Sequence, residues 1–340
     1  MKHIGLAPLL ALLVILTPAR GFAQALTLDD AGAYTARTLF STSNGTGGFA
    51  FDSAGDIFYL GGPNGGFYSE SELLEADAAN YNSSSPITRF ASPISGDFVT
   101  VHDNTIYYGQ YVSSNSGPIT AVNSKGSHSI NVPGNYDLAF SGTTAFVSAD
   151  VTGTNNEVYT LNTVTGAYKP LFSTGGDYSG PITFDAKGDL IYGASGAAIG
   201  GDIYVFSHAM VQQTIMDSGT LQRANAEMVI TGPIGNSSLV VIGNELYDAY
   251  ANGFDPGTLT AYNLTNGAAT LIATQENPGY SFSAIGDFDG SLFVDETDGS
   301  TLSEFIDITP IPEPGAAWLG VAGLGLILLF RRRRARDENA

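Results

Sequence analysis

Acidic side chains are the most concentrated chemically active groups in this 340-residue sequence. Asp287, Asp289 and Asp295 lie in one short stretch that begins Asp287-Phe288-Asp289-Gly290. Carboxylate oxygens at this density suit Ca²⁺, which takes about six to eight oxygen ligands. The stretch lacks the spacing and the terminal Glu of an EF-hand loop, and tight turns also favour Asp and Gly. We therefore expect a turn first and a Ca²⁺ site second, here and at the similar phrases Asp52–Asp56 and Asp185–Asp189.

Catalytic side chains form no recognisable constellation. His3 lies in the apolar N-terminal segment, and His102, His128 and His208 each lack a second histidine nearby. The sequence contains no H-E-x-x-H, G-x-S-x-G or phosphate-binding G-x-x-x-x-G-K-[ST] motif. It has no cysteine, which excludes disulfides, thiolate metal sites and a cysteine nucleophile. A Ser–His–Asp site assembled from distant segments stays open, but we expect ordinary hydrogen bonds at each histidine and no enzyme.

The strongly negative charge of the chain limits the classes of partner that it can bind. Between residues 26 and 330 only six basic residues stand against 31 of the 33 acidic ones, because Asp337 and Glu338 lie in the tail. A field of this sign repels nucleic acid and anionic lipid, and it favours cations or basic partners. We expect no nucleic-acid binding.

The first 25 residues have the three parts of a signal peptide. Lys2 and His3 precede the apolar run Ile4–Leu16, and Ala23-Gln24-Ala25 follows as a small-residue cleavage pattern. This pattern predicts export and removal by signal peptidase after Ala25, with Ala23 and Ala25 in the narrow subsites of the enzyme. A retained N-terminal anchor is the alternative.

The C-terminal residues 310–340 carry a second recognisable pattern. Pro312-Glu313-Pro314 precedes an apolar run over 315–330, and the arginines that follow are Arg331, Arg332, Arg333, Arg334 and Arg336. A helix of this length rises about 24 Å, and snorkelling arginines can extend it toward the roughly 30 Å hydrocarbon core. The arginines place the tail inside and the body outside the cytoplasmic membrane. A plain C-terminal anchor with an incidental Pro-Glu-Pro is the alternative.

In this order, the motif, the helix and the arginine cluster resemble the PEP-CTERM sorting domain of Gram-negative bacteria that make exopolysaccharide. The resemblance covers only the two ends of the chain. It implies recognition by exosortase, a membrane cysteine transpeptidase that cuts near residues 312–314. The body would then be transiently anchored by the helix before it reaches the cell surface or the extracellular matrix. The resemblance assigns no activity to the body.

The body repeats one phrase. Residues 49–60 (FAFDSAGDIFYL) and 182–193 (ITFDAKGDLIYG) are its clearest copies, and weaker copies begin near 97, 136, 239 and 282. Each copy predicts a short strand, a tight Asp/Gly/Asn turn and a second strand, and further strands such as Glu157–Asn162 follow most of them. Four antiparallel strands per repeat are typical of a β-propeller blade. The phrasing resembles propellers of the senescence-marker-protein or NHL-like kind, whose functional residues find no matching motif here.

Six copies predict an all-β, six-bladed propeller over residues 26–309. The last copy has a third strand, Leu302–Ile308, but lacks a fourth, and Tyr34–Phe40 can supply it and close the ring. Alternatives are a seven-bladed ring with Ala224–Gly232 in an extra blade, a β-sandwich or a β-helix. Two segments, Gly61–Ser85 and Asp217–Ser238, are predicted to be irregular insertions and sites of recognition.

These observations favour a non-enzymatic exported protein that binds matrix polysaccharide or another surface protein. Phe67, Tyr68 and Tyr81 are candidate aromatic platforms for glycans. The alternative is an extracellular hydrolase or lactonase with a divalent metal in the central channel. Such an enzyme would direct several Asp, Glu, Asn or His side chains at one ion near the mouth of that channel.

Overall fold

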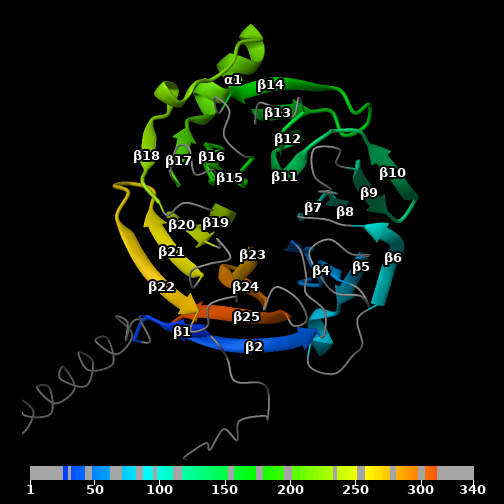
Figure 1. The fold of residues 1–340 in the computed structure, drawn as a ribbon, viewed down its shortest axis with the longest axis vertical. Coiled ribbons are helices and arrows are strands. Elements are labelled where there is room, and N and C mark those ends of the chain that lie inside the picture. The colour runs from blue at the N-terminus through cyan, green and yellow to red at the C-terminus, as the bar shows by residue number, and fades with distance from the viewer. Residues whose placement is uncertain are drawn as a thin grey trace, which may run out of the picture.

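A computed structural model of the chain contains six antiparallel β-sheets arranged around a central axis (Figure 1). The structure describes residues 26–29, 32–42, 48–61, 71–81, 87–94, 98–109, 117–151, 157–173, 179–194, 201–232, 236–250, 257–275, 281–297 and 303–311. The predicted signal peptide and the predicted sorting tail from Pro312 onward lie outside the described residues. Within the described ranges, no helix is both long enough and apolar enough to cross a membrane.

Each sheet is one blade. In the lists that follow, the strand named first in each blade lies nearest the axis. Blades 1 to 3 consist of β3 (Phe49–Phe51), β4 (Ile57–Gly61), β5 (Ser71–Ala76) and β6 (Ile87–Ile94); β7 (Val99–His102), β8 (Thr105–Tyr108), β9 (Ile119–Asn123) and β10 (Gly126–Ile130); and β11 (Asn135–Ser141), β12 (Thr144–Ala149), β13 (Glu157–Leu161) and β14 (Tyr168–Ser173). Blades 4 to 6 consist of β15 (Ile182–Phe184), β16 (Leu190–Gly193), β17 (Ile203–Phe206) and β18 (Met228–Ile230); β19 (Asn236–Ile242), β20 (Glu245–Tyr250), β21 (Thr258–Asn263), β22 (Ala269–Gln275) and β1 (Leu26–Leu28); and β23 (Ser281–Phe288), β24 (Ser291–Thr297), β25 (Ser303–Pro310) and β2 (Tyr34–Thr42).

The innermost strands form a closed ring. Each of them contacts the innermost strand of the next blade, and β23 of blade 6 contacts β3 of blade 1. The structure thus confirms a six-bladed propeller. The seven-bladed alternative is wrong, because Met228–Ile230 pairs with Ile203–Phe206 as the outermost strand of blade 4.

The N-terminal strands close this ring on two blades. Strand β2 pairs antiparallel with β25 from Tyr34 opposite Pro310 to Thr42 opposite Ser303, as predicted for the missing fourth strand. Strand β1 adds a fifth strand to blade 5 by pairing with the outer strand β22, with Leu26 opposite Gln275. The two N-terminal strands thus cover the outer edges of blades 5 and 6.

The core lies between blades, because strand side chains alternate between the two faces of each sheet. Between blades 6 and 1, the rings of Phe49 and Tyr59 meet Phe305 edge-on, with centroids 5.4 and 5.1 Å away. Between blades 5 and 6, Leu259 and Phe282 belong to one cluster of fully buried side chains. Apolar contact from blade to blade therefore holds the ring together.

Both segments predicted to be irregular insertions contain regular structure. Gly61–Ser85 includes β5, the third strand of blade 1, and the short 3-10 helix η1 (Ala78–Asn80). Asp217–Ser238 follows helix α1 (His208–Asp217) and includes η2 (Arg223–Asn225) and β18. The interpretation of these segments as irregular insertions was wrong for their described parts, which supply β5 to blade 1 and β18 to blade 4.

Candidate functional site

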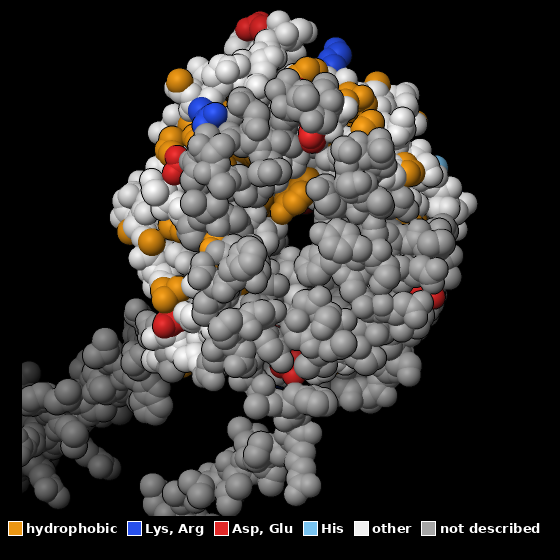
Figure 2. All heavy atoms as spheres, viewed as in Figure 1, with side chains coloured by type: hydrophobic (Ala, Val, Ile, Leu, Met, Phe, Trp, Pro, Cys, Tyr) orange, Lys and Arg blue, Asp and Glu red, His pale blue; other side chains and the backbone are white. Residues whose placement is uncertain are grey.

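The propeller has two faces of different chemistry. We call the end where the innermost strands turn back, at positions such as 52–56 and 185–189, the turn face. We call the opposite end, where β11 begins at Asn135 and β12 ends at Ala149, the loop face. Figure 2 shows the molecule along the ring axis, with an opening near its centre.

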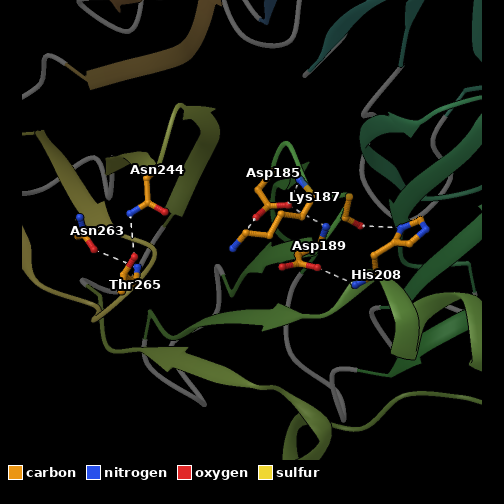
Figure 3. A network of polar contacts seen from close by, with 8 residues as sticks. Asp185, Lys187, Asp189, His208, Asn244, Asn263 and Thr265 are labelled. Atoms are coloured by element: carbon orange, nitrogen blue, oxygen red, sulfur yellow. Dashed lines mark hydrogen bonds and ion pairs between the residues drawn. The ribbon is translucent and has the colours of Figure 1, made fainter.

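On the turn face, the first aspartate of each clear repeat forms the turn itself. Asp52 Oδ1 accepts hydrogen bonds from the backbone N–H groups of Ala54 and Asp56, at 2.8 and 3.0 Å. Asp185 Oδ1 does the same for Lys187 and Asp189, at 2.8 and 2.9 Å (Figure 3). These carboxylates are Asx-turn acceptors, as the turn interpretation predicted.

The second aspartate of each phrase begins the helix that follows the third strand. Asp56 Oδ1 accepts from Ala78 N at 2.9 Å at the start of η1, and Asp189 Oδ1 accepts from His208 N at 2.7 Å at the start of α1. A carboxylate at this position satisfies a backbone N–H that has no partner within the helix. Both aspartates therefore have a structural role in positioning the outer part of the blade.

The three histidines of the body lie on two blades, His102 on β7 and His128 on β10 of blade 2, and His208 at the start of α1 in blade 4. His208 Nδ1 is 3.3 Å from Gly188 O (Figure 3), and His128 Nε2 is 3.1 Å from Thr163 O. His102 stacks on Phe140 with ring centroids 4.0 Å apart. His102 Nε2 also lies 3.3 Å from the Oδ2 of its neighbour Asp103, so each histidine contacts only groups of its own surroundings and not another histidine.

Tyr81 corresponds in blade 1 to His208 in blade 4. Its hydroxyl donates to Gly55 O, as the His208 ring contacts the equivalent Gly188 O, and its ring stacks on Phe40. Tyr81 thus packs beneath the turn face, which makes it a poor glycan platform. The other two candidate platforms, Phe67 and Tyr68, lie outside the described residues.

The predicted metal ligands Asp287, Asp289 and Asp295 do not share one site. Asp287 lies opposite Leu292 in the β23–β24 hairpin, and Asp289 occupies its turn with φ of 51°. Asp295 is three residues beyond Leu292, about 10 Å along the strand and on the other face of the sheet. It is fully buried, and Ser283 Oγ donates to its Oδ2 at 2.5 Å.

The loop face has a different character, because buried polar side chains accumulate beneath it. The polar groups that are buried without a hydrogen-bond partner lie near the loop-face ends of their strands, and they include Tyr59 Oη, Asn135 Oδ1, Ser148 Oγ, Asn236 Oδ1, both Asp248 oxygens, both Glu296 oxygens and the Gln275 amide. An unpartnered buried polar group costs about 1–3 kcal/mol. In native structures each such group calls for an explanation, such as a bound water, an ion or a functional role.

Two asparagines at this end repeat the same contact. Asn135 begins β11 and donates to Gly117 O and Val132 O, at 2.9 and 2.8 Å. Asn236 begins β19 and donates to Ala194 O and Gly201 O, at 3.0 and 3.3 Å. In each case the side-chain amide links the start of an innermost strand to a strand end of the preceding blade or to a connecting segment. These hydrogen bonds hold the backbone in place at the loop face.

Asp248 is the most isolated carboxyl group in the described part of the chain. It lies on β20 opposite Leu239, is 1% exposed, and has no hydrogen-bond partner for either oxygen. Burial raises its pKa to about 8, so the group is mostly protonated at neutral pH. Burial, and to a lesser extent the nearby Asp248, raise the pKa of Tyr262 to about 12.

Asp137 is a second acid with a raised pKa, half-buried at a β-bulge on the innermost strand β11. Its Oδ2 accepts from Ile182 N of the next blade at 2.8 Å, and its Oδ1 accepts from Leu138 N at 2.8 Å. Burial raises its pKa to about 6, and the two backbone hydrogen bonds oppose that rise. Asp137 therefore links blades 3 and 4 close to the axis.

Glu296 and Glu304 form a carboxylate pair at the loop-face end of blade 6. They lie directly opposite each other on β24 and β25 and are 2% and 6% exposed. Burial and the neighbouring Glu304 raise the pKa of Glu296 to about 7, while the amide of Gln275 lowers it. Burial also raises the pKa of Glu304, against a hydrogen bond from Ser41 Oγ at 3.4 Å.

Among the described residues, no three His, Asp or Glu side chains gather within reach of one metal ion. The acidic side chains of described residues that can be seen in Figure 2 are scattered over the face in view. The strongest polar groupings are thus the turn-face Asx turns and the buried groups beneath the loop face.

Comparison with known proteins adds little beyond the fold. No protein-family model matches the chain, and no curated protein matches it. Among solved structures, it is similar to the computationally designed Ika8 protein, at 13% identity and TM-score 0.44 over 78% of this chain and 71% of that one. It is also similar to the WD40 β-propeller domain of Doa1, at 10% identity and TM-score 0.49 over 77% of this chain and 78% of that one. At these scores the architecture rests on the strand pairing described above.

Sequence reasoning missed Asp248, Glu304 and Gln275 as notable groups. A signal for the glutamates was present, because Leu292, Val294 and Glu296 alternate on one face, as do Ile308, Ile306 and Glu304. A carboxylate that continues an apolar alternation indicates burial. The predicted sorting residues 312–314 and 331–336 and the cleavage residues Ala23 and Ala25 lie outside the described part of the chain.

Proposed function

We propose that the protein is exported, sorted by exosortase through its C-terminal tail, and binds matrix polysaccharide or a surface protein with its propeller. The support for export is the order of signals in the sequence: an apolar leader with a cleavage pattern, and Pro-Glu-Pro, apolar run and arginines at the other end. The support for binding is the difference between the two propeller faces.

The carrying observation is the accumulation of buried polar groups beneath the loop face. On the turn face, Asp52 and Asp185 satisfy the backbone locally, so little hydrogen-bonding capacity is left for a ligand. Under the loop face, amide and carboxyl groups such as Asn236 and Asp248 retain unused capacity. Amides and carboxyls are the groups that recognise sugar hydroxyls and peptide backbone, and loops on a rigid scaffold are common recognition sites.

Sorting is tested by the intact mass and location of the protein in its host and in a strain that lacks the transpeptidase. We expect a body that begins at Leu26, ends near residues 312–314 and leaves the membrane only when the transpeptidase is present. Glu313→Ala should block this processing, whereas Glu338→Ala, in the same tail but outside the motif, should not. A mass that retains residues 316–340 in both strains would show that the tail is a simple anchor.

Binding is tested separately by cosedimentation of the released body with exopolysaccharide from the same host. We expect retention that competing free polysaccharide removes. Failure to sediment with either polysaccharide or washed host cells would refute a matrix-binding role and leave the sorting result standing.

A second candidate function is an extracellular hydrolase or lactonase with a metal in the central channel. Asp137 favours it to a limited degree, because this acid with a raised pKa lies on an innermost strand. Hydrolysis of ester and lactone substrates by the released body, lost in Asp137→Asn and on chelation, would support this function over the binding role.

A further inference from the structure

The carboxylates of Glu296 and Glu304 are placed next to each other by the strand register itself. The two residues are directly opposite in the β24–β25 ladder, where Cβ atoms are about 4.5–5.5 Å apart. Both are almost completely buried. Like charges in this position repel each other, so the fold holds the pair together against a cost.

A third polar side chain reaches the pair from the neighbouring blade. Gln275 ends β22 of blade 5, is 1% exposed, and lies close enough to Glu296 to lower the pKa of its carboxyl group. Nevertheless, neither the Gln275 amide atoms nor the two Glu296 oxygens make a hydrogen bond of normal geometry. Gln275 is also confined, since a Cβ at Gly257 would lie 2.4 Å from its Oε1.

No basic side chain neutralises this group from its own two blades. Across the strands of blades 5 and 6 the sequence contains a single Lys or Arg, which is Arg37 on β2. Arg37 pairs with Asp307 at 3.0 Å, and its side chain is 71% exposed. The buried oxygens of Glu296, Glu304 and Gln275 therefore converge without a positive partner from the strands that carry them.

We propose that Glu296, Glu304 and Gln275 bind a divalent cation of the Ca²⁺ type between blades 5 and 6. Two carboxylates and an amide oxygen supply up to five hard oxygen ligands, and backbone carbonyls or water complete the six to eight that Ca²⁺ takes. The ion replaces the missing positive partner, and the strongly acidic body favours its approach. This site is distinct from the Asp287-Asp289-Asp295 set and does not depend on the proposed sorting or binding role.

The ion would reinforce the closure of the ring. Glu304 lies opposite Ser41 of β2, and Gln275 lies opposite Leu26 of β1. A cation held by these residues joins the two blades that carry the N-terminal strands. Because it binds the closed ring and not the unfolded chain, it stabilises the closed ring in proportion to its concentration over its dissociation constant.

The test uses the full chain, stripped of metal with a chelator and titrated with CaCl₂ in a calorimeter. We expect one bound Ca²⁺ per chain, affinity at least about tenfold lower in Glu296→Gln and Glu304→Gln, and unchanged affinity in Asp248→Asn, a buried acid between other blades. A tenfold loss corresponds to about 1.4 kcal/mol. Equal affinity in all four proteins, or no binding in the wild type, would overturn the proposal.

A second measurement on the wild type alone covers variants that fail to fold. Hydrogen exchange with and without Ca²⁺ should show slower amide exchange in β22, β24 and β25, with no change in β7–β10 of blade 2. Slowing confined to the turn at 287–291 would place the ion elsewhere and refute this site. The proposal would also fail if Ca²⁺ did not change the stability of the wild type and the glutamine variants were more stable than the wild type. That result would show that the two glutamates share a proton instead of binding an ion.

Discussion

Replacing Asp248 with Asn should change the pH dependence of stability in a calculable way. In the unfolded chain this carboxyl titrates near its ordinary pKa of 3.8, whereas burial raises the pKa to about 8 in the folded protein. The folded state therefore binds the proton more tightly. Its contribution to stability is fully present below about pH 4 and is lost as the pH rises toward 8.

The magnitude follows from the separation of the two pKa values. Between pH 5 and 7 the unfolded carboxyl is ionised and the folded one is protonated, so wild-type stability falls by about 1.4 kcal/mol per pH unit relative to Asp248→Asn. From pH 4 to pH 7 the accumulated difference is about 4 kcal/mol. Because Asn cannot titrate, any fixed cost of burying its amide shifts the variant equally at every pH.

Urea unfolding at several pH values between 4 and 8 measures this difference directly. The exposed Asp289, whose φ of 51° Asn also tolerates, provides the matched control Asp289→Asn, which makes the same chemical change at a carboxyl group on the surface. If the free energies of unfolding of wild type and Asp248→Asn stay parallel across this range, Asp248 is ionised in the folded protein and the reasoning fails.

Three further substitutions test the closure, the repeated asparagine contact and the turn. Leu39→Ala in β2, at a side chain only 4% exposed, should lower the free energy of urea unfolding by about 2–5 kcal/mol; a loss no larger than that of the exposed Thr38→Ala would contradict a packed closing strand. Asn236→Ala removes bonds to Ala194 O and Gly201 O and should cost about 1–3 kcal/mol in the same assay, with an unchanged midpoint as the contrary result. Gly188→Ala puts a Cβ 2.6 Å from His208 Nδ1 at φ of 84°, so we expect a loss of about 1–3 kcal/mol that His208→Ala recovers only in part; strictly additive effects in the double-mutant cycle would show that the two residues do not interact.

The repeat and the closure of the ring were predictable because their signals are local. Turns such as Asp185–Asp189 depend on an aspartate that accepts its own neighbouring N–H groups and a glycine at positive φ, and both are visible in the sequence. A last blade that lacked one strand, together with an unassigned Tyr34–Phe40, was enough to predict the β2–β25 pairing that the structure shows.

Other elements escaped because their sequences carry weak signals. Strand β1 has three residues, and β5 contains Glu-Leu-Leu-Glu, which favours helix as much as strand. Helix α1 has a single fully buried residue, Val211, so its apolar period is faint. In each case pairing or packing with distant residues decides the structure.

The buried groups beneath the loop face were harder to predict, because their environment depends on register. Glu296 was visible only as part of an acidic stretch, and its neighbours Glu304 and Gln275 come from another strand and another blade. A β-bulge between Phe282 and Ala284 also shifts the register of β23 against β24. Local patterns cannot supply that information.

The pairing of β2 with β25 also governs the order in which the molecule can fold. Residues 34–42 emerge early in synthesis, yet their partners are residues 303–310, which emerge much later. Until then β2 has no sheet to join, and the incomplete row of blades presents open edges that other chains can pair with. Contacts this distant along the chain form slowly, so completion of the ring should limit the folding rate.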